Sequence, residues 1–215
     1  MLKNNRSVIT TLREEKFMKK LFTQTAIILV IVMFSLPVYA GAALDSVQKC
    51  VNEVIGIVGD PKLKSESAKE LKKEKLRVLY KQMFDEIEFS KRTLTRNWNN
   101  FTPAQRTEFV NLFGQVLETA YGDKVLSYTN EKVVFYKETT LSATQAEVQS
   151  KIVTSSKEIP VFYRVILKDG KWKVYDVVVE NVSLVQNYRT QFNDILSKDK
   201  PEKLLEVLRN KVKQH

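Results

Sequence analysis

Few side chains in this chain of 215 residues are suited to acid–base or nucleophilic chemistry. The only histidine, His215, is the last residue, and chain ends usually fray. This excludes catalytic triads that contain histidine and metal sites that need several histidines. The sequence also lacks the G-x-S-x-G elbow, the P-loop and the glycine pattern of dinucleotide-binding folds.

Two carboxylates form the best remaining candidate for catalysis. Asp176 and Glu180 lie four residues apart on a predicted strand, so their side chains could share one face. Paired carboxylates can support hydrolysis, but a salt bridge at the strand end or a turn contact is the favoured interpretation. We therefore expect no catalytic residues, no metal site and no cofactor.

The charge and the cysteine content narrow the class of protein. The formal net charge is +10; residues 1–40, with six Lys or Arg and two Glu, carry +4, which leaves +6 for residues 41–215. This basicity could favour anionic headgroups or acidic partner surfaces, or it could belong to a solvated surface without a special partner. The sequence contains neither a basic arm nor the ligand spacing of a zinc site, so nothing in it indicates nucleic-acid binding. Cys50 is the only cysteine, so no intramolecular disulfide can form.

The N-terminal residues have the pattern of a secretory signal peptide. Lys19 and Lys20 precede an apolar run over 26–34, and Val38-Tyr39-Ala40 resembles a cleavage site. The apolar run is shorter than the roughly 20 residues that span a bilayer. We therefore expect residues 1–40 to be a signal peptide, with 1–17 as extra upstream residues, and residues 41–215 to form one exported domain.

Helices are predicted wherever apolar residues recur at helical spacing. Thr102-Pro103-Ala104-Gln105 is the clearest start signal, because it combines an N-cap hydroxyl, a proline at the first helical position and a capping-box glutamine. Gly122 is expected to end that helix, and Ser183 is expected to cap another. The predicted helices cover residues 44–58, 76–87, 89–98, 103–121 and 184–196, and a last helix begins at Pro201.

The pattern changes to that of strands after the first helices. Four runs rich in Val, Ile, Thr, Tyr and Phe follow, over 132–141, 145–154, 158–168 and 171–180. Asp169-Gly170 between the last two runs is typical of a two-residue hairpin. The expected fold is therefore α+β, with N-terminal helices packed on a curved antiparallel sheet of about four strands, and C-terminal helices.

Large apolar side chains are abundant on the predicted elements, especially over 109–121 and 159–163. Strands that are apolar on both faces must be covered on both sides. Either these side chains form an ordinary core, or part of them lines an enclosed apolar pocket. The periodicity does not separate the two interpretations.

A strand, a turn and a helix near the C-terminus carry a recognisable motif. The matching residues are Gly170, Trp172, Val174, Tyr175, Asp176, Val177, Glu180, Val182, Ser183, Asn187, Tyr188, Arg189, Gln191 and Phe192. Together with residues 101–128 and 159–165, this motif resembles the MlaC, or toluene-tolerance, family of periplasmic lipid carriers. The glycine usual in the turn is Asn181 here, and asparagine tolerates a left-handed backbone better than most residues.

The resemblance implies a fold related to nuclear-transport-factor-like and cystatin-like sheets around a deep apolar pocket. It implies a monomeric, non-enzymatic periplasmic carrier with glycerophospholipid as cargo and no nucleic-acid partner. The implied partners are an outer-membrane lipoprotein–porin complex and an inner-membrane ABC transporter with an MCE-domain subunit, and the implied role is to maintain outer-membrane lipid asymmetry. The alternatives are a non-catalytic adaptor with a solid core, a carrier of another apolar ligand, and a small enzyme with a polar pocket.

In such a carrier, acyl tails should contact the inner face of the sheet and the helix that covers it. Arg164 and Arg189 are candidates for the lipid phosphate near the mouth, because a guanidinium matches phosphate oxygens. The alternative for these arginines is a salt bridge to Asp176 or Glu180. The candidate tail contacts are Phe109, Phe113, Leu117, Tyr121, Val148, Ile152, Val161, Tyr163, Val165, Trp172, Val174, Val178, Tyr188 and Phe192.

Overall fold

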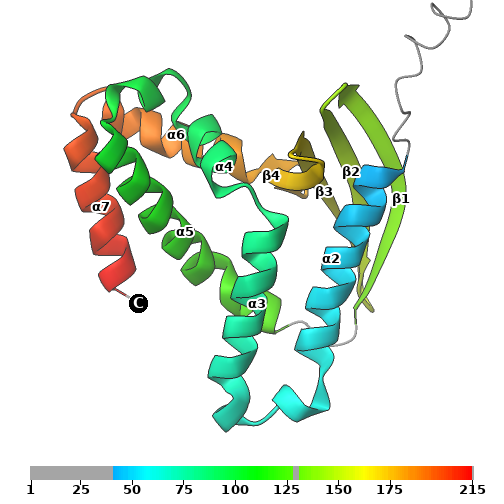
Figure 1. The fold of residues 1–215 in the computed structure, drawn as a ribbon. Helices are drawn as coiled ribbons and strands as arrows, with labels where there is room; N and C mark the ends of the chain where they lie inside the picture. Colours follow the sequence, from blue (N-terminus) through cyan, green and yellow to red (C-terminus); the bar gives the residue numbers. More distant parts are fainter. Residues whose placement is uncertain (1–40, 128–130, 215) are drawn as a thin grey trace, which may run out of the picture. The chain divides into compact units, whose positions relative to one another are not determined.

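The computed structural model of the chain describes residues 41–127 and 131–214 (Figure 1). Helices come first, an antiparallel sheet follows, and two helices end the chain, so the predicted α+β class is confirmed. The predicted signal peptide at 1–40 lies outside the described residues and stays a prediction.

The sheet has five strands in sequence order, and every neighbouring pair is antiparallel. The four long strands match the predicted runs, because β-branched and aromatic residues dominate them. The fifth strand was not predicted, since it consists only of Val182 and Ser183, which pair with Val179 and Val178. The strands are β1 (Lys132–Ser142), β2 (Gln145–Val153), β3 (Glu158–Lys168), β4 (Lys171–Val179) and β5 (Val182–Ser183).

Two tight turns depend on residues with left-handed backbone. Asp169 and Gly170, with φ of 50° and 73°, connect β3 to β4 as the sequence predicts. Glu180 and Asn181, with φ of 49° and 67°, connect β4 to β5 in the same way. Among two-residue hairpins, the type I′ turn has positive φ at both central positions, as both of these turns do. Asn181 therefore takes the conformation for which a glycine would be the usual choice.

Bulges decide which side chains share a face of the sheet. The pairing between β3 and β4 shifts by one residue at Arg164/Val165, so that Tyr175 is an extra residue in β4. Paired residues in antiparallel strands point to the same side. We call the side that carries Val148, Val165 and Val174 the inner face, and the side that carries Arg164 the outer face.

Two helices pack on the inner face of the sheet. Helix α2 (Ala42–Gly59) contacts β1, β2 and β4, and α3 (Lys69–Met83) packs on α2 and β4. Glu138 of β1 accepts hydrogen bonds from the N–H groups of Gly41 (3.2 Å) and Leu44 (2.7 Å). A carboxylate at this position satisfies free donors and complements the helix dipole. Short 3₁₀ turns at Pro61–Leu63 and Glu66–Ala68 connect the two helices.

The remaining helices form a second group, in which α5 packs on α7 and α4 on α6 (Figure 1). The predicted capping box is present, since Thr102 and Gln105 exchange hydrogen bonds at 2.9 and 3.3 Å. The prediction that Gly122 ends α5 is wrong: a glycine within a helix costs only about 1 kcal/mol, and the helix continues to Leu126. These elements are α4 (Glu86–Leu94), a 3₁₀ segment (Thr95–Asn100), α5 (Pro103–Leu126), α6 (Leu184–Leu196) and α7 (Pro201–Lys213).

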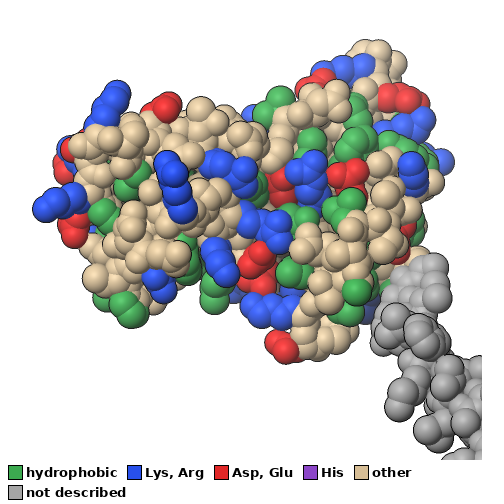
Figure 2. All heavy atoms as spheres, turned by 90° about the horizontal axis from the view of Figure 1, so that it is seen from above, with side chains coloured by type: hydrophobic (Ala, Val, Ile, Leu, Met, Phe, Trp, Pro, Cys, Tyr) green, Lys and Arg blue, Asp and Glu red, His purple; other side chains and the backbone are tan. Residues whose placement is uncertain are grey.

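The surface reflects the composition of the chain. Seen from above, basic side chains are interleaved with acidic ones, and apolar patches lie between them (Figure 2). None of the described helices combines the length and the apolar composition that crossing a membrane requires.

The conformation of Asn181 generates a prediction about stability. Asn181→Val should lower the free energy of unfolding by about 1–2 kcal/mol, because a β-branched side chain resists a left-handed backbone. Asn181→Gly, the control, should leave that free energy within about 0.5 kcal/mol of the parent value. Urea unfolding followed by circular dichroism measures both, and an equal loss in the two variants would contradict the turn geometry.

Candidate functional site

An apolar cluster covers the inner face of the sheet, and we call it the sheet cluster. Its buried members come from α2, the end of α3 and β2, β3 and β4, and half-buried side chains surround them. The buried members are Ala43, Val47, Met83, Ala146, Val148, Val165 and Val174. The half-buried members are Leu44, Cys50, Val51, Phe84, Phe135, Tyr163, Trp172 and Val177.

A second apolar cluster, the helix cluster, fills the space among α4, α5, α6 and α7. Four aromatic rings form its centre. Phe113 lies 5.5 Å from Phe109, 4.8 Å from Tyr188 and 5.2 Å from Phe192, measured between ring centroids. Ring pairs at such separations attract one another beyond their hydrophobic burial. This cluster therefore behaves as a solid core.

Phe84 is half-buried and packs against both clusters. Its ring stacks on Tyr80 at 4.7 Å and approaches Phe89 at 6.4 Å. The neighbouring Asp85 donates its N–H to the carbonyl oxygen of Val174 at 2.9 Å, which fixes the chain here against β4. Burial raises the pKa of Tyr80, so the phenol stays neutral. Phe84 is thus the link between the sheet cluster and the helix cluster.

The inner face contains few polar atoms. Ser150, fully buried, donates its hydroxyl to the carbonyl oxygen of Val161 at 2.8 Å. Burial raises the pKa of the Tyr163 phenol to about 12, so Tyr163 is neutral at physiological pH. The indole N–H of Trp172 is buried without a hydrogen-bond partner among the described residues. This environment suits apolar groups.

The predicted tail contacts divide between the two clusters. Two candidates that belong to neither cluster, Ile152 and Val161, point to the inner face because the residues they pair with lie on that face. Six candidates lie in the helix cluster: Phe109, Phe113, Leu117, Tyr121, Tyr188 and Phe192. Five lie in the sheet cluster: Val148, Tyr163, Val165, Trp172 and Val174.

Val178 does not share the inner face. Simple alternation would place it beside Val174, but the bulge at Tyr175 reverses the alternation. Val178 pairs with Phe162 and therefore lies on the outer face. The placement expected for Val178 is wrong.

The helix that covers the inner face is also different from the expected one. Helix α5, which carries Phe109 and Phe113, packs on α7 and α4, whereas α2 contacts the sheet. The apolar spacing of Leu44, Val47 and Val51 predicts an apolar face on α2. Spacing within one helix does not reveal which surface it will cover, and the contacts made by α2 were missed for this reason.

A depression of about 550 Å³ on the outer face brings the two predicted arginines together, and we call it the arginine depression. Arg164 contacts Glu147 and Asp176, each at 3.2 Å, so one of the two interpretations left open, a salt bridge to Asp176, is what the structure contains. Arg189 pairs with neither Asp176 nor Glu180; it donates to the carbonyl oxygen of Arg92. The sheet separates this depression from the sheet cluster.

The carboxylates Asp176 and Glu180 do not form a pair. Asp176 is buried and accepts hydrogen bonds from Arg164, from the Ser183 hydroxyl at 2.6 Å and from the Val185 N–H at 3.0 Å. Glu180 forms an ion pair with Lys157 at 3.3 Å. Asp176 thus connects β4 to the start of α6, and Glu180 belongs to the turn.

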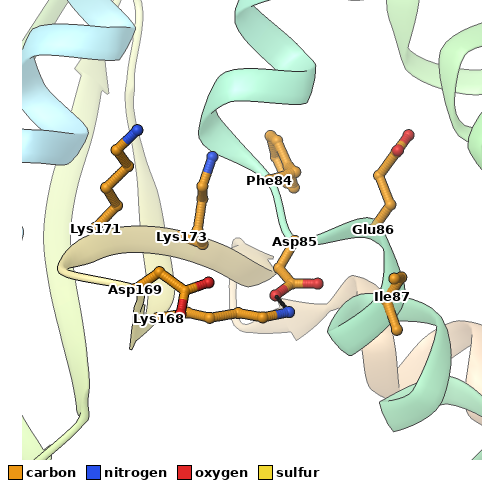
Figure 3. A pocket seen from close by; sticks show the side chains of 8 residues that line it. All are labelled: Phe84, Asp85, Glu86, Ile87, Lys168, Asp169, Lys171 and Lys173. Atoms are coloured by element: carbon orange, nitrogen blue, oxygen red, sulfur yellow. Dashed lines mark hydrogen bonds and ion pairs between the residues drawn. The ribbon is translucent and has the colours of Figure 1, made fainter.

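A second depression, of about 390 Å³, lies between the α3–α4 junction and the β3–β4 hairpin (Figure 3). Lys168 turns toward Asp85 and pairs with it at 2.8 Å, whereas Lys171 and Lys173 point the other way. By itself, burial would raise the pKa of the Asp85 carboxyl. Hydrogen bonds from Lys168 and from the N–H of Glu88 outweigh that effect, so the pKa lies below its usual value. The depression is bounded by a structural ion pair.

Metal chemistry has no support in the part of the chain that the structure describes. No group of three or more His, Cys, Asp or Glu side chains gathers there in a way that could hold an ion. Cys50 is half-buried, and burial raises the pKa of its thiol, which disfavours the reactive thiolate.

The sequence matches the family model described as "MlaC protein" over residues 48–210, which is more than half of the chain. The chain belongs to the MlaC family. The resemblance seen in the motif from Gly170 to Phe192 is confirmed.

Two curated relatives support this assignment. The "Intermembrane phospholipid transport system binding protein MlaC" of Haemophilus influenzae is 26% identical over 115 residues, which cover 51% of this chain and 54% of that protein. The "Toluene tolerance protein ttg2D" of Pseudomonas putida is 27% identical over 99 residues, 46% of each chain. This MlaC-family chain therefore spans about half the length of the curated relatives it matches.

A solved structure shares the fold. It is a phospholipid-binding protein from Ralstonia solanacearum, in complex with a phospholipid. The TM-score is 0.72 at 24% sequence identity, and the match covers 80% of this chain and 97% of that chain. This MlaC-family member thus has the architecture of that protein.

The Asp85–Lys168 pair generates a prediction about pH. Because the pKa of Asp85 is lowered in the folded protein, its carboxylate stabilises the fold above an unfolded pKa of about 3.9, and the effect is lost as the pH falls through the folded value. Lys168→Met should lower the free energy of unfolding at pH 7 by up to about 1 kcal/mol. Denaturant unfolding should show that this difference shrinks below about pH 4.

Lys171→Met is the matched control for this pair. Lys171 lines the same depression but forms no ion pair with any described residue. Its replacement should cause no loss that depends on pH. A Lys168→Met effect of equal size at pH 3 and pH 7 would contradict the role given to the ion pair.

Proposed function

We propose that this MlaC-family protein is a phospholipid carrier that shelters acyl chains against the inner face of its sheet. One observation carries the proposal: no inner-face position of β2, β3 or β4 holds a charged side chain, and Glu138, the charged inner-face residue of β1, is engaged with the first turn of α2. These positions are Ala146, Val148, Ser150, Ile152, Ile159, Val161, Tyr163, Val165, Leu167, Trp172, Val174, Val177 and Val179.

The physical need for such a surface follows from the cargo. A phospholipid with two chains carries roughly 30 methylenes, and exposing each to water costs about 0.8 kcal/mol. The total, on the order of 20 kcal/mol or more, prevents rapid escape of free lipid into water. A carrier must therefore cover both tails, in a space near the upper part of the usual range for ligand cavities, about 800–1,000 Å³.

The half-buried side chains of the sheet cluster are the best candidates for contact with the tails. Tyr163, Trp172 and Val177 still have apolar surface to cover, whereas Val148 and Val165 are fully buried. Chains that enter beside Phe84 pass between the two clusters, where one side chain forms the link. In this proposal, the aromatic centre of the helix cluster forms one wall of the space that the tails occupy.

The headgroup can remain in water, so few polar contacts are required. Arg164 and Arg189 do not contact the cargo phosphate in this proposal, because the arginine depression lies across the sheet from the tails. Binding without catalysis fits the polar residues that are present. Asp176 and Glu180 are engaged in structural contacts.

We propose that this carrier works in the periplasm. The signal-peptide pattern at 1–40 and the word "intermembrane" in the name of the Haemophilus relative support it. The proposed partners are an outer-membrane lipoprotein–porin complex and an inner-membrane ABC transporter with an MCE-domain subunit. Movement of phospholipid between them by a monomeric carrier would maintain the lipid asymmetry of the outer membrane.

The direct test is mass spectrometry of organic extracts from the protein purified without detergent. We expect close to one phospholipid per chain, because a pocket that covers two tails binds its cargo strongly enough to survive purification. The acyl composition of the extract gives the number of tails held. Protein that is free of lipid and takes up no added phospholipid would contradict the carrier function and favour an adaptor.

A pair of variants tests the inner face specifically. Val177→Glu places a charge on the inner face and should reduce copurified phospholipid at least about tenfold, because burying an unpaired charge beside hydrocarbon costs several kcal/mol. Ile166→Glu makes a comparable change at a half-buried position of the outer face and should leave the lipid content unchanged. Circular dichroism confirms that both variants fold. Equal lipid content in the two would place the cargo elsewhere.

A further inference from the structure

Three arginines from three different elements line the arginine depression. Arg92 comes from α4, Arg164 from β3 and Arg189 from α6. The bulge in β4 adds two consecutive residues, Tyr175 and Asp176, to the same lining. Residues far apart in the sequence thus converge on one side of the sheet, opposite the apolar inner face.

Each of the three guanidinium groups is held in place. Arg92 stacks over the ring of Tyr175, 3.7 Å from its centroid, and its Nε donates to Glu88 at 2.8 Å. Arg164 is held by Glu147 and Asp176. The Nε and Nη2 atoms of Arg189 donate to the carbonyl oxygen of Arg92 at 3.1 and 3.0 Å. Side chains fixed in this way lose little conformational entropy when they bind a ligand.

The acceptors in the lining are engaged, but donors remain. Asp176 already accepts three hydrogen bonds, and Glu147 accepts from Arg164 and Gln149. Within 41–127 and 131–214, no residue accepts a hydrogen bond from the terminal nitrogens of Arg92. No carboxylate in the same ranges forms an ion pair with Arg189. Arg189 also donates through Nη1 to Gln186 at 3.0 Å, so the terminal nitrogens of Arg92 remain as donors, and three arginines against Glu147 and Asp176 leave the lining with a net positive charge.

We propose that the arginine depression binds a phosphate group. A guanidinium fork matches two phosphate oxygens, so the free fork of Arg92 suits the anion, and Arg164 and Arg189 add positive charge beside it. The phosphate could belong to a soluble phosphate ester or to headgroups at a membrane surface, and the chemistry of recognition is the same for both. This site is separate from the proposed cargo surface and does not depend on it, because the sheet lies between them.

Isothermal titration calorimetry with inorganic phosphate, at constant ionic strength, tests the proposal. We expect saturable binding with a dissociation constant below about 1 mM, and no competition from acetate. Arg92→Gln should weaken the binding at least tenfold. Arg96→Gln is the matched control, because it removes the same charge from an exposed position outside the depression, and it should bind like the parent.

A second variant covers the case in which Arg92→Gln fails to fold. Leu141 lines the depression and is 51% exposed, so Leu141→Glu introduces negative charge without disturbing the core. It should abolish phosphate binding. The proposal is overturned if phosphate shows no saturable binding, if acetate competes equally, or if Leu141→Glu binds like the parent.

Vesicle sedimentation then separates the two sources of phosphate. Binding to phosphatidylglycerol vesicles that Leu141→Glu removes would identify membrane headgroups, whereas phosphate binding without vesicle binding would identify a soluble ester; either result supports the site. Copurified phospholipid is measured in the same variants and should be unchanged. Loss of cargo with retained phosphate binding would count against the carrier function alone, and the reverse would count against the phosphate site alone.

Discussion

The extra residue that Tyr175 inserts into β4 controls what each face of the sheet contains. In a regular strand, Val174 and Asp176 would point to the same side. The carboxylate of Asp176 would then lie within the sheet cluster, where an unpaired charge costs several kcal/mol. The bulge turns Asp176 to the outer face, where Arg164, Ser183 and the N–H of Val185 satisfy it. An apolar inner face and an ordered start of α6 depend on the same irregularity.

This separation gives the two faces different chemistry. On β2, β3 and β4 the inner face presents only uncharged side chains, because the charged contacts that organise the chain are made at the outer face and, through Glu138 of β1, at the start of α2. On the outer face, Arg164 balances the charges of Glu147 and Asp176, which leaves Arg92 with terminal nitrogens that no described residue accepts from. A carrier that must hold apolar cargo and also meet charged surfaces benefits from this division.

Local signals in the sequence predicted much of the fold. Thr102 and Gln105 mark a helix start, and Asp169-Gly170 marks a hairpin, because each feature depends on neighbouring residues alone. The four long strands follow from their β-branched and aromatic composition. Asn181 adopts the left-handed conformation for which a glycine is usual. These elements were predictable because their determinants lie within a few residues.

The arrangement of the candidate site was less predictable. The bulge at Tyr175 results from pairing with β3 and reverses the face of Val178, so alternation counted along one strand gives the wrong answer. The choice of α2 over α5 as the cover of the inner face is equally non-local. In the structure, Glu138 of β1 holds the start of α2 against that surface. Residue types predicted an apolar surface and an arginine pair, but only tertiary contacts decide that they lie on opposite sides.

The attachment of α2 to the inner face determines what must move when a carrier takes up or releases lipid. Helix α2 is attached to the sheet by hydrogen bonds at its first turn and by apolar contacts of residues such as Val47 along its length. Hydrocarbon offers the same kind of contact as the side chains that it would replace, so uptake changes packing but breaks no ladder of the sheet. The hydrogen-bonded framework, from the bulge in β4 to the caps of α2 and α6, can therefore stay fixed while the apolar layer rearranges. For the proposed carrier, this means that cargo binding depends on the half-buried residues of the sheet cluster, while the helix cluster and the hydrogen-bonded framework keep the fold in place.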